Sequence, residues 1–139
     1  VFTGMELTSL DLCNCQQLTG DIEAFKGMPL ISLNLGYCRN LTGVMPPHIF
    51  VLLLEGKANF KGCGTVTMPS AEAMAQASPD VIDRFQAIEK VDLSEMRNLA
   101  GDIEVFKEMK LTKLNLYYCQ KLTGKDKAKK MFPNADVIV

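Results

Sequence analysis

Five cysteines are the residues of this 139-residue chain best suited to nucleophilic, redox or metal chemistry. They are Cys13, Cys15, Cys38, Cys63 and Cys119. An odd number of cysteines with no Cys-x-x-Cys pair argues against a disulfide framework and against a zinc site. We therefore expect reduced thiols and an intracellular, reducing compartment, whereas the sequon Asn40-Leu41-Thr42 keeps a secreted origin formally open.

Acid–base catalysis has few candidates in this sequence. The single histidine, His48, stands beside Pro46 and Pro47, and a lone imidazole in a proline-rich turn is typical of a surface residue. Two Asp-x-Glu pairs recur in equivalent segments, at residues 21–23 and 102–104, which favours a role in turns. No phosphate-binding loop, Gly-x-Ser-x-Gly or His-Glu-x-x-His motif occurs. The sequence thus predicts no enzyme, cofactor or metal site, and a deep pocket around His48 with a carboxylate partner would favour the enzymatic alternative.

The strongest pattern in the chain is a repeat of 23 residues. Residues 7–20 read LTSLDLCNCQQLTG, and residues 30–43 read LISLNLGYCRNLTG. Two further copies of this pattern begin at Ile88 and Leu111. A regular repeat of this length predicts a stack of similar units, in which neighbouring units bury one another's apolar side chains.

Each repeat contains a short strand whose leucines face inward. In the segment Leu10-Asp11-Leu12 the alternation points both leucines into the interior and the aspartate outward. The same offsets continue through the middle of the chain at Ile49, Leu52, Leu54, Lys57, Phe60 and Gly62. We therefore predict parallel strands near residues 9–13, 32–36, 51–55, 90–94, 113–117 and 136–139. We expect a common interior lined by Leu12, Leu35, Leu54, Leu93 and Leu116.

The L-x-x-L-x-L-x-x-C-x-x-L-T-G blocks resemble the leucine-rich-repeat family. The Leu-Thr-Gly ending is similar to plant-type repeats, and the cysteine in the turn is similar to the cysteine-containing class. This resemblance covers nearly the whole chain and implies an α/β solenoid with a single parallel sheet of about six short strands and a helical or irregular convex side. We expect one domain over residues 1–139. Lys57 departs from the family pattern, because it stands where Cys or Asn is usual.

Two segments depart from the regular repeat. Residues 63–87 form an insertion in which Ser70 caps one helix, and Ser78 with Pro79 opens a second. Residues 125–139 form a C-terminal cap with a lysine-rich helix and a final strand.

Two sets of side chains are expected to fill the interior around these strands. The first is a ladder of small groups in the turns, made of Cys15, Cys38, Met96 and Cys119. The second is an aromatic spine made of Phe2, Phe25 and Phe106.

The outward positions of the strands form columns that a partner could contact. The candidate partner-binding residues of this concave face are Asp11, Asn34, Tyr37, Leu53, Glu55, Asp92, Asn115, Tyr117 and Tyr118. Leu53 is the apolar centre of the face, and tyrosines beside small polar residues are typical of protein recognition.

The function predicted from these columns is a non-catalytic protein–protein interaction module with a protein partner of unknown identity. The formal net charge of −1 gives no reason to expect nucleic acid, and no apolar stretch is long enough to predict membrane insertion. The alternative is a structural accessory subunit, held in a larger assembly through its convex side and lysine-rich end.

Overall fold

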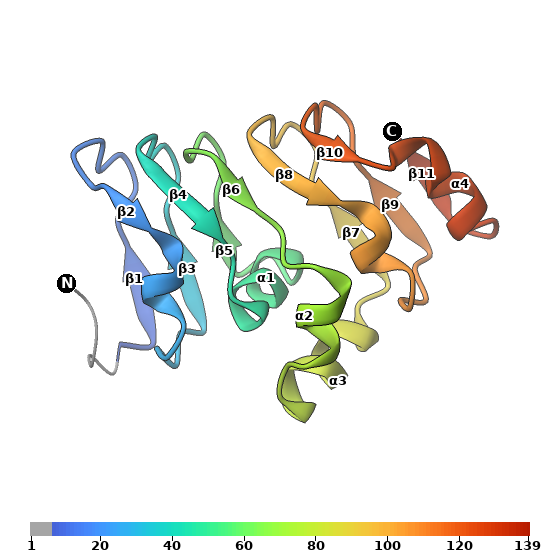
Figure 1. Cartoon of the computed structure of the whole chain (residues 1–139), viewed down its shortest axis with the longest axis horizontal. Helices are drawn as coiled ribbons and strands as arrows, with labels where there is room; N and C mark the ends of the chain where they lie inside the picture. Colours follow the sequence, from blue (N-terminus) through green and yellow to red (C-terminus); the bar gives the residue numbers. More distant parts are fainter. Residues whose placement is uncertain (1–6) are drawn as a thin grey trace.

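The computed structural model describes residues 7–139 as a mixed α/β chain whose units lie side by side along one direction (Figure 1). Each complete unit contains a first strand, a turn, a second strand and a helical segment. The first strands are β1 (Ser9–Asp11), β3 (Ser32–Asn34), β5 (Ala58–Asn59), β7 (Lys90–Asp92), β9 (Lys113–Asn115) and β11 (Asp136–Ile138). The second strands are β2 (Gly20–Asp21), β4 (Leu41–Val44), β6 (Val66–Thr67), β8 (Leu99–Asp102) and β10 (Leu122–Thr123).

The helical segments follow the second strands. They are η1 (Ile22–Phe25), α1 (Pro47–Leu54), α2 (Ala71–Ala75), α3 (Pro79–Ala87), η2 (Ile103–Phe106), η3 (Lys125–Lys127) and α4 (Ala128–Met131). Ser70 and Ser78 accept hydrogen bonds from Ala73 N and Val81 N, which confirms both predicted helix caps of the insertion. The predicted insertion starts too early, because β6 pairs with β4 and β8 as part of the regular stack. The lysine-rich helical segment and the final strand predicted near the end of the chain are present as η3, α4 and β11.

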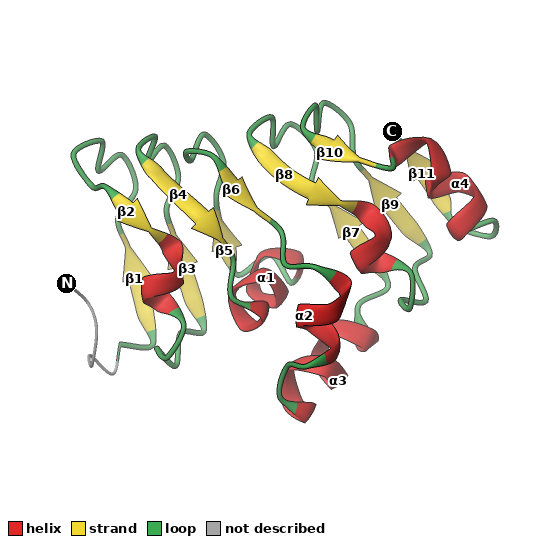
Figure 2. Cartoon of the chain, in the orientation of Figure 1, coloured by secondary structure: helices red, strands yellow, loops and turns green. Residues whose placement is uncertain are grey.

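The single sheet expected from the sequence is wrong. Within residues 7–139 the second strands form one five-stranded parallel sheet in the order β10-β8-β6-β4-β2. The first strands form two separate parallel sheets, β1-β3-β5 and β11-β9-β7, which Figure 2 shows on either side of a break. We call this break between β5 and β7 the split. The unbroken sheet therefore holds the two halves of the stack together where the other sheet is interrupted.

The strand predicted near residues 51–55 is also wrong, because this segment belongs to helix α1. Pro47 occupies the first turn, where its fixed φ suits a helix and its missing N–H costs nothing. Ile49 through Leu52 are all at most 1% exposed, so this run is covered on every side. A short apolar run of this kind fits a buried helix as well as a buried strand. The first strand of the third unit is instead β5, at Ala58 and Asn59.

One apolar interior runs through the described units. Leu35, Leu54, Leu93 and Leu116 are buried in a single cluster, and Leu12 packs against it, which confirms the predicted common interior. Leu54 reaches that interior from helix α1 instead of from a strand.

An aromatic cluster attaches the insertion helices to this interior. The ring of Phe50 in α1 lies 6.2 Å from that of Phe85 in α3 and 6.0 Å from that of Phe106 in η2, measured between centroids. Phe25 and Phe106 of the predicted spine are buried, whereas Phe2 lies outside the described residues. Arg84 of α3 also donates from Nη2 to Glu55 Oε1 at 2.6 Å and from Nε to Glu55 Oε2 at 3.3 Å. Helices α1 and α3 are therefore joined beside the split by ring contacts and by a two-point ion pair.

Gly64 provides a test of how closely the units approach one another. A Cβ at this position would overlap the carbonyl oxygen of Leu41 and would lie 2.7 Å from that of Arg39. Because both obstacles are backbone atoms, Gly64→Ala should lower the free energy of unfolding by about 1–3 kcal/mol, as overpacking does. Gly27→Ala is the matched control, since its Cβ would meet nothing within 4 Å. Urea denaturation of both variants measures the difference, and equal stability of the two would contradict the close packing inferred here.

Candidate functional site

We give the name strand face to the outward side chains of the first strands and of the residues that flank these strands, including the turn that follows each strand. Its central column contains Asp11, Asn34, Asn59, Asp92 and Asn115. Each of these side chains accepts a hydrogen bond through Oδ1 from the backbone N–H two residues later, at 2.9 to 3.1 Å. The column therefore fixes the turn that follows each strand as well as presenting polar groups to a partner.

Asn59 takes the place in this column that the sequence analysis gave to Leu53. Leu53 is half-buried in α1, and Glu55 follows that helix and is paired with Arg84, so neither residue belongs to the strand face. The correct alignment was available from the cysteines. Asn59-Phe60-Lys61-Gly62-Cys63 has the same spacing as Asn34-Leu35-Gly36-Tyr37-Cys38, so Cys63 marks the third turn. Lys57 and Lys61, which this alignment places on the face, were not among the residues predicted from the sequence to bind a partner.

A second column runs along the turns, one residue before each cysteine position. Asn14, Tyr37, Glu95 and Tyr118 have φ between 60° and 65°, and Gly62 has φ 68°. Residues other than glycine rarely adopt this left-handed backbone conformation. The N–H groups of Asn14, Tyr37 and Glu95 donate to the next unit at 2.6 to 2.8 Å, so stacking holds the backbone in this conformation.

The tyrosines of the predicted site lie in or beside this second column. The rings of Tyr117 and Tyr118 lie 4.3 Å apart, and the guanidinium of Arg97 lies 5.1 Å from the ring centre of Tyr118. These two tyrosines remain 47% and 44% exposed. The exposed ring of Tyr37 covers Gly62, where a Cβ would lie 2.5 Å from Tyr37 Cδ1. The strand face therefore presents preordered aromatic surface to solvent.

The cysteines line the interior of the turns. Sγ of Cys38 donates to Leu12 O at 2.9 Å, and Sγ of Cys119 donates to Leu93 O at 2.7 Å. Burial raises the pKa of Cys38 and Cys119, and it raises the pKa of Cys63 to about 11, so these thiols stay protonated at neutral pH. The predicted ladder is confirmed for Cys38 and Cys119 and gains Cys63, whereas Cys15 is exposed and Met96 is half-buried.

The turn contacts change at the split. Met96 stands at the cysteine position there, and a thioether has no hydrogen to donate to the preceding unit. Gly62 N, which precedes the split, makes no bond to the next unit among the described residues. Asn98 Nδ2 donates to Cys63 O at 3.3 Å, and Lys61 pairs with Glu95 at 3.6 Å across the gap. A cavity of about 190 Å³ remains between the two turns.

His48 lies half-buried in the first turn of α1, not on the surface turn expected for it. Its Nε2 atom is buried and has no hydrogen-bond partner among the described residues. Burial and the positive charge of Arg84 lower the pKa of His48, so the imidazole is neutral at pH 7. In the part of the chain that the structure describes, no carboxylate orients this ring. The geometry provides no acid–base pair at His48.

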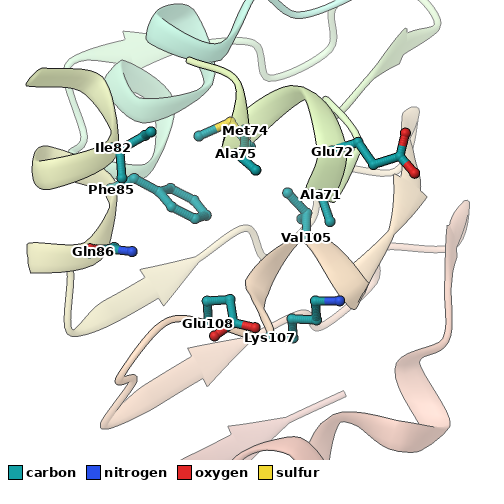
Figure 3. Close-up of a pocket in the computed structure, with 10 residues that line it drawn as sticks. All are labelled: Ala71, Glu72, Met74, Ala75, Ile82, Phe85, Gln86, Val105, Lys107 and Glu108. Carbon is teal, nitrogen blue, oxygen red and sulfur yellow. The ribbon is translucent and has the colours of Figure 1, made fainter. Parts of the chain in front are cut away.

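A separate groove of about 300 Å³ lies between α2, α3 and η2 (Figure 3). Met74, Phe85 and Val105 form its apolar floor, with Lys107 and Glu108 at the edge. The groove could receive an apolar side chain, but its lining contains no nucleophile beside a base. Across residues 7–139, no group of three or more histidine, cysteine, aspartate or glutamate side chains could hold a metal ion. In the same residues, no helix combines the length and apolar character needed to cross a membrane.

Successive strand–turn–strand units with inward leucines are typical of leucine-rich repeats. The Leucine Rich Repeat family model matches residues 6–28, so this segment, which holds β1, β2 and η1, is a leucine-rich repeat. Domains built from this repeat generally mediate protein–protein interaction. Searches of curated proteins and of solved structures each found no match to the chain.

Asp92 offers a test of the polar column through its titration. The hydrogen bond from the Ser94 side chain, then that from Ser94 N, lower the pKa of Asp92, and Lys113 adds to the effect. A carboxylate with a lowered folded-state pKa adds stability above its unfolded pKa of about 3.9, and this stability is lost as pH falls through the folded-state pKa. Asp92→Asn should therefore be less stable than the native chain at pH 7, and this difference should shrink towards pH 3.

Thermal unfolding from pH 7 to pH 3 measures this effect. Ser94→Ala, which removes the hydroxyl but keeps the backbone N–H, should give an intermediate difference in stability. The stability difference between Asp92→Asn and the native chain should not stay constant across this range. A constant difference would show that the hydrogen bonds from Ser94 do not stabilise the ionised carboxylate.

Proposed function

We propose that this chain is a non-catalytic module that binds a partner protein through its strand face. In this proposal the stacked units form a leucine-rich-repeat solenoid, and the strand face is its concave side. The proposal rests chiefly on the exposed Tyr117–Tyr118 pair with Arg97 beside it. Tyrosine and arginine dominate the binding energy of many protein interfaces, because they bury large areas at a small entropic cost.

The order within the turns supports the same function. The side chains of the central column hold the backbone of each turn, and the left-handed residues Asn14, Tyr37 and Glu95 are held by bonds to the next unit. A surface that is already rigid loses little conformational freedom on binding. We further propose a reducing intracellular compartment, which is consistent with the free cysteines of the chain.

The double variant Tyr117→Ala/Tyr118→Ala tests this function. Because each ring is exposed and available to a partner, their joint removal should weaken binding of a captured partner by about tenfold to hundredfold. Partners are captured from cell extract with the native chain, identified, and titrated against each variant by calorimetry. The thermal midpoint of the double variant should stay close to that of the native chain.

Lys129→Glu/Lys130→Glu is the matched control, because both lysines are exposed on α4, which is not part of the strand face. Under the proposed function this control binds the partner as the native chain does. If the tyrosine variant binds the partner as well as the native chain does and the lysine variant loses binding, the proposed function is rejected. That result would favour the alternative of an accessory subunit held by its lysine-rich end.

A further inference from the structure

The split leaves two strand edges unpaired. The N–H of Leu35 donates to the carbonyl of Asn59, so the backbone groups of Asn59 point toward β3. Because the backbone groups of successive residues in a strand point to opposite sides, those of the neighbouring Ala58 point toward the split. The same alternation turns the backbone of Asp92 toward the split, because its neighbour Leu93 donates to β9. Among residues 7–139, the N–H and C=O groups of Ala58 and Asp92 have no hydrogen-bond partner. Both edges thus offer a donor and an acceptor that an extended peptide could pair with.

Exposed lysines stand at both of these edges. Lys57 and Lys90 each lie two residues before the Asx residue of the central column in their own unit, and Lys113 lies directly opposite Lys90 in register. Like charges directly opposite each other destabilise a sheet. In the described part of the chain neither Lys90 nor Lys113 forms an ion pair. Lys57 pairs with Glu55.

Glu55 neutralises Lys57 only in part. Its Oε1 lies 3.8 Å from Lys57 Nζ but 2.6 Å from Arg84 Nη2, so the carboxylate is already engaged by the guanidinium. Lys57 and Lys90 therefore keep positive charge that no carboxylate in the described residues fully pairs, in spite of the near-zero net charge of the whole chain. A carboxylate bound between Lys57 and Lys90, or between Lys90 and Lys113, would relieve the repulsion among these lysines.

We propose that the split is the docking site for an extended acidic segment of the partner protein, an inference that rests on the proposed function. The segment lies along an edge of the split, pairs its backbone with Ala58 or Asp92, and places carboxylates on Lys57 and Lys90. The free backbone groups favour a peptide over nucleic acid.

A synthetic octapeptide of alternating serine and glutamate is the probe for this site. In heteronuclear NMR titrations of the native chain, its binding should shift the amide signals of Ala58, Asn59 and Asp92. A glutamine-for-glutamate peptide tests the need for carboxylates, and a peptide N-methylated at alternate residues tests the backbone pairing. Both should bind about tenfold more weakly than the probe. A homopolymeric RNA of matched length, whose charges come from phosphate, should bind more weakly than the probe.

The variant Lys57→Gln/Lys90→Gln should weaken binding of the probe by about tenfold, whereas Lys129→Gln/Lys130→Gln should leave it unchanged. Equal binding of all the peptides, shifts confined to residues outside the split, or tighter binding of RNA would each overturn the proposal. Failure here is distinguishable from failure of the proposed function. If the probe does not bind at the split while partner binding still depends on Tyr117 and Tyr118, the partner uses the strand face without an acidic segment.

Discussion

No unit of this chain can close an interior by itself, and the rest of the structure follows from that constraint. Each complete unit contributes a few inward residues from its strands and one or two helical segments, and only the neighbouring units cover them. The second strands meet this requirement without interruption, as one parallel sheet from β2 to β10. The chain therefore tolerates a break between β5 and β7, because β6 still joins the two halves by pairing with both β4 and β8.

The turns show how stacking and local chemistry support each other. An Asp or Asn side chain holds the N–H two residues later, and the residue after that adopts a left-handed backbone. Bonds to the next unit offset the cost of that conformation where stacking is complete, as at Tyr37. At the split the thiol is replaced by Met96, the left-handed position is Gly62, and the bond from Gly62 N to a following unit is missing. These changes in the turns lie at the same place as the unpaired edges of β5 and β7.

The break also divides the strand face chemically. The outward side chains of β1 and β3 are small and carry a single charge, that of Asp11, whereas the outward residues in and beside β5, β7 and β9 carry charges of both signs, those of Lys57, Lys61, Lys90, Asp92, Glu95 and Lys113. The Tyr117–Tyr118 pair adjoins the second group. The surfaces proposed for binding therefore lie together on the C-terminal part of the face, next to the insertion that separates the two sheets.

The sequence by itself determined the repeat, the inward leucines, both serine caps, the terminal cap and the tyrosines, because these depend on spacing and on contacts within a few residues. Three features were decided by the tertiary structure: α1 in place of a third strand near residues 51–55, Asn59 in place of Leu53, and the split. Residues 49–54 form an unbroken apolar run, and periodicity cannot separate a buried helix from a buried strand in such a run. Whether β5 and β7 pair depends on how α1, α3 and the ring of Phe50 fill the space beside them, and no short stretch of sequence encodes that packing.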